Sequence, residues 1–177
     1  MTKIGRTMAD LLPIIVDDKR FNWPSNQERI SNDIDQLANL FGKVGPHFDA
    51  KSVTYRVSYE VMLKHLQETQ AAHRTHNPAY TQNMLRELVS ICTSCHTQDD
   101  KLRTLFLGAN RKAFDNDYYY AEFNFLSRNY PLAIEHYKRY LNSTHAEISE
   151  EETLDSLRNL LIMQVQIDQD PAQAIKT

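Results

Sequence analysis

Two thiols and an imidazole stand together in the run Cys92-Thr93-Ser94-Cys95-His96. Thiols at this spacing can each add across a vinyl group of haem, and the histidine that follows them can ligate the iron. On an α-helix, positions i, i+3 and i+4 share one face, so all three residues would address the same porphyrin. The run therefore predicts one covalently bound haem c, with Cys92 and Cys95 as attachment points and His96 as the proximal iron ligand.

Two other chemistries of a Cys-x-x-Cys pair have less support. A thioredoxin-type redox pair belongs at the start of a helix that follows a strand, and no strand pattern precedes Cys92. A structural zinc site requires four ligands, whereas the chain contains two cysteines, so zinc would need scattered histidines as well. Haem attachment is the interpretation that the run favours.

The composition favours an all-α protein. The 177 residues include four glycines and six prolines, and no long alternating run of Val, Ile and Thr occurs. A net charge of −3 gives no electrostatic argument for a nucleic-acid partner. No apolar run approaches the roughly 20 residues that span a bilayer. Because haem is attached outside the cytoplasm, we expect a periplasmic protein whose signal peptide has been removed, since residues 1–6 lack the apolar core of such a signal.

Two amphipathic segments in the first part of the chain are predicted to be helices. The first runs from about residue 4 to residue 18 and contains Pro13, which should bend it. The second begins at a capping box in residues 25–28. It is expected to end within residues 42–46, where two glycines and a proline occur.

Two further helices are predicted before Gly108, joined by short loops. The third runs from about Ser52 to His76. The fourth opens at Asn77-Pro78, a cap followed by proline at the first helical position, and it carries the haem signal near its C-terminal end on the buried face. Residues 1–108 are therefore predicted to form an antiparallel four-helix bundle that holds the haem. The third helix is expected to bury the stripe Val53, Val57, Val61, Leu66 and Ala72.

Residues 109–177 are predicted to form a second, tetratricopeptide-like helical domain. Small and aromatic residues alternate through two expected helices, with Ala121 in the first and Ala133 and Tyr137 in the second, which resembles a tetratricopeptide unit. Arg128-Asn129 replaces the usual glycine of the turn. A poorer second copy follows, so this half is either a fragment of a longer solenoid or a helical appendage of the bundle.

The bundle topology restricts which residues can reach the distal side of the iron. The end of the fourth helix should lie beside the start of the first, the end of the second and the start of the third. The groups there that can bind iron are the thioethers of Met8 and Met62 and the imidazole of His47. Met8 is the best placed, because it lies on the apolar face of the first helix, and a thioether trans to histidine gives a low-spin iron suited to electron transfer.

The layout resembles class II cytochromes c, that is cytochrome c′ and its low-spin relatives, and also the b-type four-helix cytochrome of the bacterial periplasm. The matching parts are Thr7-Met8-Ala9-Asp10-Leu11 and Leu88 through His96. Together with the helix pattern they cover about residues 1–107. In the low-spin relatives a methionine early in the first helix is the distal ligand, and the resemblance gives that role to Met8.

These observations predict an electron carrier. His96 and Met8 would hold the iron, and residues 109–177 would dock a redox partner protein, because helical repeats make concave binding surfaces. If Met8 is packed away from the iron, the sixth position is vacant or blocked, and the protein would bind nitric oxide or carbon monoxide as cytochrome c′ does. A third interpretation makes the haem a structural part of an interaction protein. No nucleophile and base accompany the haem signal, so an enzyme that hydrolyses or transfers groups has no support.

Overall fold

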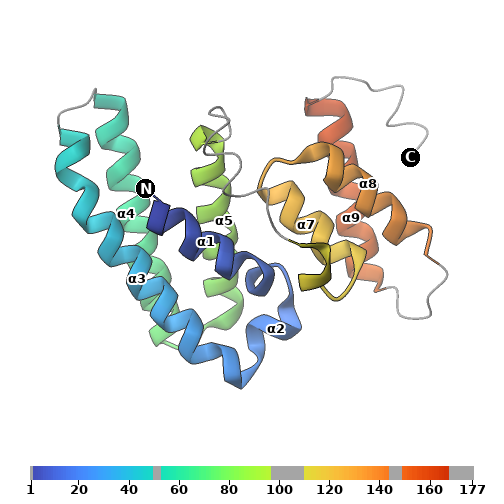
Figure 1. The fold of residues 1–177 in the computed structure, drawn as a ribbon, viewed down its shortest axis with the longest axis horizontal. Coiled ribbons are helices and arrows are strands. Elements are labelled where there is room, and N and C mark those ends of the chain that lie inside the picture. Colours follow the sequence, from blue (N-terminus) through green and yellow to red (C-terminus); the bar gives the residue numbers. More distant parts are fainter. Residues whose placement is uncertain (1, 50–52, 97–109, 144–148, 168–177) are drawn as a thin grey trace. The chain divides into compact units, whose positions relative to one another are not determined.

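The computed structural model describes residues 2–49, 53–96, 110–143 and 149–167 (Figure 1). Every regular element within these ranges is helical, which confirms the predicted all-α class. The chain divides into two compact units, unit 1 with residues 1–108 and unit 2 with residues 109–177. Among the described residues, none of the helices is long and apolar enough to cross a membrane.

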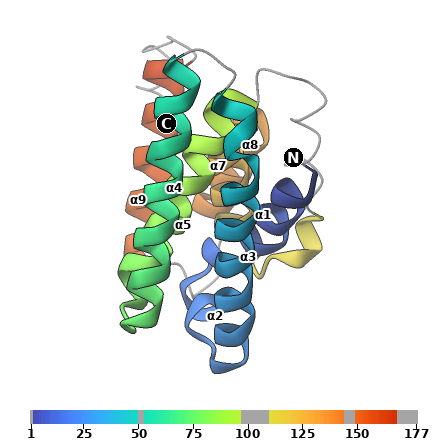
Figure 2. The ribbon, with the colours of Figure 1, turned by 90° about the vertical axis from the view of Figure 1, so that its left-hand side faces the viewer.

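Unit 1 is built from four longer helices and one short helix. α3 packs against α1 and α4, and α5 packs against α1 and α4 (Figures 1 and 2). The short α2 packs against α1, α3 and α5. Apolar side chains from all of the longer helices are buried between them, among them Leu11, Ile34, Leu66 and Leu88. In chain order the helices of unit 1 are α1 (Thr2–Ile15), α2 (Asp18–Asn22), α3 (Pro24–Asp49), α4 (Val53–Arg74) and α5 (Pro78–His96).

α3 continues through the residues that were expected to end it, so that prediction is wrong. Gly45 of α3 lies against the Tyr59 side chain of α4, because a Cβ atom added at Gly45 would stand 2.8 Å from the Tyr59 hydroxyl. The glycine therefore serves close helix packing. Pro46 removes one backbone hydrogen bond only, to Gly42, which is exposed and can be solvated. Tertiary packing along α4 outweighs these local breaking signals.

The junction between α1 and α3 also differs from the prediction. α1 ends at Ile15, and the separate helix α2 follows it. α3 begins at Pro24, so no capping box forms at residues 25–28. Instead, Asn26 Nδ2 donates to Arg20 O at 2.7 Å, and Gln27 Nε2 donates to Phe21 O at 2.6 Å. These polar side chains donate to carbonyls in the last turn of α2, where Arg20 O also accepts from the backbone N–H of Trp23 at 3.3 Å.

The other two predicted helices of unit 1 compare differently with the structure. The cap of α5 is confirmed, because the backbone N–H of Tyr80 donates to Asn77 Oδ1 at 3.3 Å. The stripe predicted for α4 is buried only in its second half, where Leu66 and Ala72 lie in the core. The remaining three members of that stripe are exposed, and the prediction is wrong for them: Val53, Val57 and Val61.

Unit 2 is built around a helical hairpin of α7 and α8, with α9 packed against both. Ala121 of α7 and Ala133 and Tyr137 of α8 have no exposed surface. Their small and aromatic side chains therefore line the hairpin interface. The C-terminal part of the poorer second copy, around Ala174, lies outside the described residues. The elements of unit 2 are η1 (Arg111–Ala113), α7 (Asp117–Leu126), α8 (Tyr130–Leu141), α9 (Glu150–Ile162) and a π-helical turn, η2 (Met163–Ile167).

The turn between α7 and α8 closes in a left-handed conformation at Arg128, where φ is 59°. The Asn129 N–H donates to Asn124 O at 2.8 Å, and the Arg128 N–H donates to Phe125 O at 3.0 Å. This pair of bonds is the Schellman motif, in which glycine is the preferred left-handed residue. Arg128 therefore occupies the position of the glycine that a tetratricopeptide turn normally has.

Replacing Arg128 with glycine is expected to raise the free energy of unfolding by about 0.5–1 kcal/mol. The gain arises because an L-residue with a side chain is strained at positive φ, and this strain exceeds the entropy that glycine gains in the unfolded chain. Urea denaturation followed by circular dichroism measures the change. The control Arg139→Gly, at an exposed position inside α8, should lower the free energy by about 1 kcal/mol. Equal effects of both variants would contradict the strain argument.

Candidate functional site

The run Cys92–His96, which is predicted to attach haem, lies at the C-terminal end of α5, a continuous helix from Pro78 to His96. Cys92, Cys95 and His96 therefore occupy positions i, i+3 and i+4 of one helix. The Cys92 side chain is 5% exposed, and it follows the fully buried Leu88 and Val89 along the same helix. Side chains of α5 are described through Thr93, so Cys95 and His96 are placed by their backbone alone.

Met8 is buried in the core of unit 1, with 1% of its surface exposed. Its helix is fixed against α5 by three hydrogen bonds from α5 side chains. Gln82 Nε2 donates to Ile15 O at 2.8 Å, and Arg86 Nε donates to the same oxygen at 3.0 Å. Arg86 Nη2 donates to Val16 O at 3.1 Å. The end of α1 is thereby held beside the first half of α5.

This joint fixes α1 and α5 as neighbours where the end of α1 meets the first half of α5. α1 crosses α5 obliquely, since it slants across the view in Figure 1 while α5 stands upright. Along α1, Met8 precedes Ile15 by about 10 Å, and along α5, Cys92 follows Arg86 by about 9 Å. The buried thioether and the buried thiol therefore belong to neighbouring helices of the same unit.

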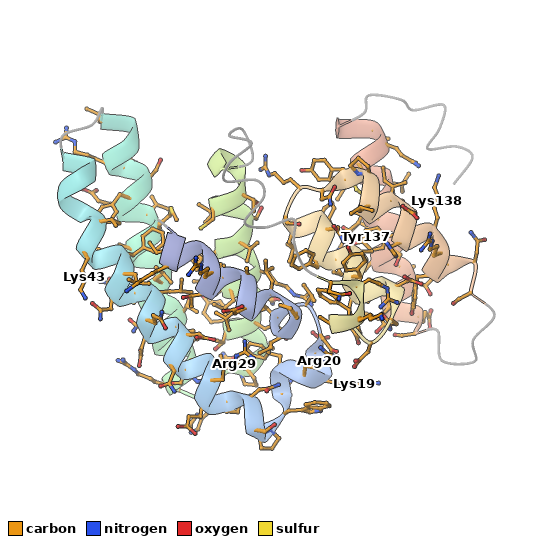
Figure 3. The ribbon with its side chains drawn as sticks, in the orientation of Figure 1. Lys19, Arg20, Arg29, Lys43, Tyr137 and Lys138 are labelled. Atoms are coloured by element: carbon orange, nitrogen blue, oxygen red, sulfur yellow. The ribbon has the colours of Figure 1, made fainter. Side chains whose placement is uncertain are left out.

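The two alternative iron ligands are less well defined. Met62 of α4 is partly buried. His47 lies in the described backbone of α3, but its side chain is outside the described set. Lys43, also on α3, is exposed and points away from the helices of unit 1 (Figure 3).

The residue types in unit 1 suit haem. The end of α5 contains two cysteines and one histidine, and α1 contributes one buried thioether, Met8; c-type haem uses such groups for attachment and axial ligation. Hard cations prefer carboxylate and carbonyl oxygens. Among the side chains that the structure describes, no group of three or more His, Cys, Asp or Glu is arranged to hold a metal ion.

A second cluster of chemically active groups is buried in unit 2. The Tyr137 hydroxyl donates to Glu122 Oε1, and Asn159 Nδ2 donates to Glu122 Oε1 at 2.8 Å and to the Tyr137 oxygen at 2.9 Å. Figure 3 shows Tyr137 inside unit 2, whereas the adjacent Lys138 points outward. Burial, and then the negative charge of Glu122, raise the pKa of Tyr137 well above its ordinary value. One residue from each of α7, α8 and α9 takes part, so the cluster fixes the three helices together.

Glu152 at the start of α9 forms a similar contact with two tyrosines. It accepts hydrogen bonds from Tyr119 at 2.9 Å and from Tyr140. Desolvation and the hydrogen bond to Glu152 raise the pKa of Tyr140 to about 12. Sequence reasoning identified Tyr137 as a packing residue and missed Glu122 and Glu152. Acidic residues are common on exposed helix faces, so their sequence positions alone do not reveal that they accept bonds from tyrosines.

Unit 2 is expected to lose stability between pH 10 and pH 12. Because the pKa of Tyr140 is raised on folding, the protonated tyrosine stabilises the fold fully below pH 10, and this contribution is lost as the pH rises through 12. The Glu152→Gln variant should ionise Tyr140 at lower pH, as measured by tyrosinate absorbance with Tyr140→Phe as the reference. Glu150→Gln, at an exposed position of the same helix, should not. An unchanged titration in Glu152→Gln would argue against the coupling.

Comparisons of the chain with protein-family models, curated proteins and solved structures found no match. The function is therefore inferred from the residues of the chain itself.

Proposed function

We propose that the protein is a periplasmic c-type cytochrome that transfers electrons through one covalently bound haem c in unit 1. The observation that carries the proposal is the continuity of α5 through His96, which gives Cys92, Cys95 and His96 the i, i+3 and i+4 positions of one helix. Each thiol would add its sulfur and its hydrogen across one vinyl double bond. His96 would be the proximal ligand. When bound, haem supplies the one-electron chemistry of its iron.

Met8 is proposed as the distal ligand, because its thioether is buried in the same helical unit as Cys92. A thioether and an imidazole as the two axial ligands would suit both oxidation states of iron, so electron transfer would require little rearrangement. α1, α3, α4 and α5 would together act as the four-helix bundle that holds the group. Buried leucines on the same two helices as Met8 and Cys92, such as Leu11 and Leu88, would help to exclude water from the site.

Unit 2 is proposed to act as a tetratricopeptide-like module that docks the protein redox partner. The support for this role is its paired helices α7 and α8, whose interface contains the fully buried Ala121, Ala133 and Tyr137. The buried bonds of Glu122 and Asn159 to Tyr137 hold α9 against this pair. A rigid helical surface of this kind offers a partner a preformed shape, which lowers the ordering cost of binding.

The test of the proposed function is the mass of the denatured protein after it is produced with a c-type haem maturation system. The expected mass is that of the polypeptide plus one haem, and the reduced protein should show sharp split absorption bands that carbon monoxide does not change. The Cys92→Ala/Cys95→Ala double variant should lose the covalent haem. A bare polypeptide would contradict the proposal. A broad spectrum that shifts with carbon monoxide would identify a gas-binding protein instead.

A further inference from the structure

Three exposed valines form a row along the first half of α4. Val53 is 63% exposed, Val57 52% and Val61 54%. They are spaced four residues apart, so they lie along one ridge of the helix. Scattered apolar residues on a surface require no explanation, whereas a continuous apolar ridge marks a place where another apolar group binds. Val53, Val57 and Val61 are together called the valine row.

The valine row continues a ridge that contacts α5. His65 is the next member of the i, i+4 series after Val61, and His65 Nε2 lies 2.6 Å from the backbone oxygen of Met84 in α5. The ridge therefore meets α5 at His65 and extends from that contact towards the start of α4. Figure 1 shows that α4 and α5 diverge in that direction. The valines therefore lack the contact with α5 that His65 makes.

The same contact aligns the valine row with the attachment cysteines. α4 and α5 form an antiparallel pair joined by the turn before Asn77. Val57 precedes His65 by about 12 Å along α4, and Cys92 follows Met84 by about 12 Å along α5. Val57 is therefore level with Cys92. By the same register, Val53 is level with His96.

We propose that the valine row is a porphyrin-contacting surface, which covers one edge of the haem that Cys92 and Cys95 hold. This inference rests on the proposed function. Haem is assigned as the occupant because the exposed valines are level with the cysteines that would tether it. Tethering also removes most of the entropic cost of bringing the porphyrin to the valine row. The ridge lies on α4, so the haem site would include a surface of the helix that neighbours the attachment helix α5.

Hydrogen exchange of the backbone amides tests this inference without reference to electron transfer. In the haem-loaded protein, amides of residues 53–61 are expected to exchange about tenfold more slowly than in the haem-free Cys92→Ala/Cys95→Ala variant. Amides of α9, which carries the exposed Leu154 and Leu161, should exchange at the same rate in both proteins. The comparison therefore has an internal control with similar apolar exposure.

A charged substitution gives a second measurement. Val57→Asp is expected to lower the yield of haem-loaded protein and to shift the Soret band and the reduction potential of the loaded fraction, because it introduces a carboxylate beside the porphyrin. The matched control Leu161→Asp, at a similarly exposed position of α9, should leave yield, band and potential unchanged. Both positions are exposed in the polypeptide, so neither substitution should prevent folding.

The outcomes separate failure of the inference from failure of the proposed function. Absence of covalent haem in the natural sequence would overturn both. Attached haem, with equal exchange of residues 53–61 in loaded and haem-free protein, would overturn the inference alone. If Val57→Asp leaves the haem spectrum and potential unchanged but slows electron exchange with a protein partner, the valine row is a docking surface, and the porphyrin assignment is wrong.

Discussion

Replacing Met8 with leucine is expected to make the haem absorption spectrum sensitive to carbon monoxide, whereas the spectrum of the natural protein should not change when the gas is added. Leucine has no atom that binds iron, so the sixth coordination position loses its ligand while the packing volume is kept. The reduced bands should broaden, and carbon monoxide should shift the Soret band. Absorption spectroscopy of the reduced variant, with and without the gas, measures both changes.

Met84→Leu is the matched control for this experiment. Met84 is also buried in unit 1, with 5% of its surface exposed, but it lies beside His65, about 12 Å along α5 from Cys92. Both leucine variants should cost less than about 1.5 kcal/mol of stability, because the volumes are similar. The stability changes should therefore agree, and the spectra should differ.

Two results would contradict distal ligation by Met8. If the natural protein already binds carbon monoxide, the sixth position is open, and gas binding is the better description of the function. If Met8→Leu leaves a sharp, gas-insensitive spectrum, another group ligates the iron, and Met62→Leu and His47→Ala become the variants to measure. Each outcome assigns the sixth position to a different residue or leaves it vacant.

Sequence patterns identified those parts of the fold that depend on local chemistry. The scarcity of strand patterns predicted an all-α chain, and Asn77-Pro78 located the start of α5 to the residue, because capping requires only groups a few residues apart. The same kind of local signal failed at Gly45 and Pro46. There, α3 continues along α4 with Gly45 against Tyr59, and no short stretch of sequence contains the information that this packing partner is present.

The two groups of residues that sequence analysis placed wrongly or missed depend on tertiary neighbours. Val53 and Val57 have the spacing of a buried stripe, but burial requires a partner helix at that height, and α5 diverges from α4 there. Glutamate is usually an exposed residue type, so sequence alone suggests a surface position for Glu122. Glu122 is buried because Tyr137 and Asn159 from other helices donate hydrogen bonds to its carboxylate. The run Cys92–His96 can be proposed as an attachment site from sequence for the opposite reason, since five consecutive residues contain all of the chemistry that haem attachment requires.

Replacing Arg86 with leucine is expected to destabilise unit 1 by about 2–3 kcal/mol and to weaken ligation by Met8. Arg86 donates to the carbonyl of Ile15, the last residue of α1, and to that of Val16, which follows it; carbonyls at this helix end have no acceptor role within the helix. Hydrogen bonds from a charged donor contribute about 1.5–3 kcal/mol. In the variant, Gln82 Nε2 still donates to Ile15 O, so this carbonyl keeps one hydrogen bond. Thermal or urea denaturation measures the loss of stability.

The matched control is Arg74→Leu. Arg74 pairs with Asp35 at 3.5 Å on the surface of unit 1, where the two side chains are 70% and 54% exposed. Exposed ion pairs contribute about 0–1 kcal/mol, so this variant should remain close to the natural protein. The comparison separates the loss of a positive charge from the loss of the carbonyl contacts at the joint between α1 and α5.

The haem spectrum distinguishes a positioning role of Arg86 from a purely structural one. If the joint between α1 and α5 helps to position Met8 as the iron ligand, every loss of about 1.4 kcal/mol from the Met8-ligated state should raise the population that binds carbon monoxide about tenfold. Arg86→Lys keeps one donor and should restore part of the gas-insensitive spectrum. A variant that unfolds more easily, yet remains insensitive to carbon monoxide while folded, would show that Arg86 stabilises α1 without positioning Met8, because ligation then depends on the core contacts of Met8 alone.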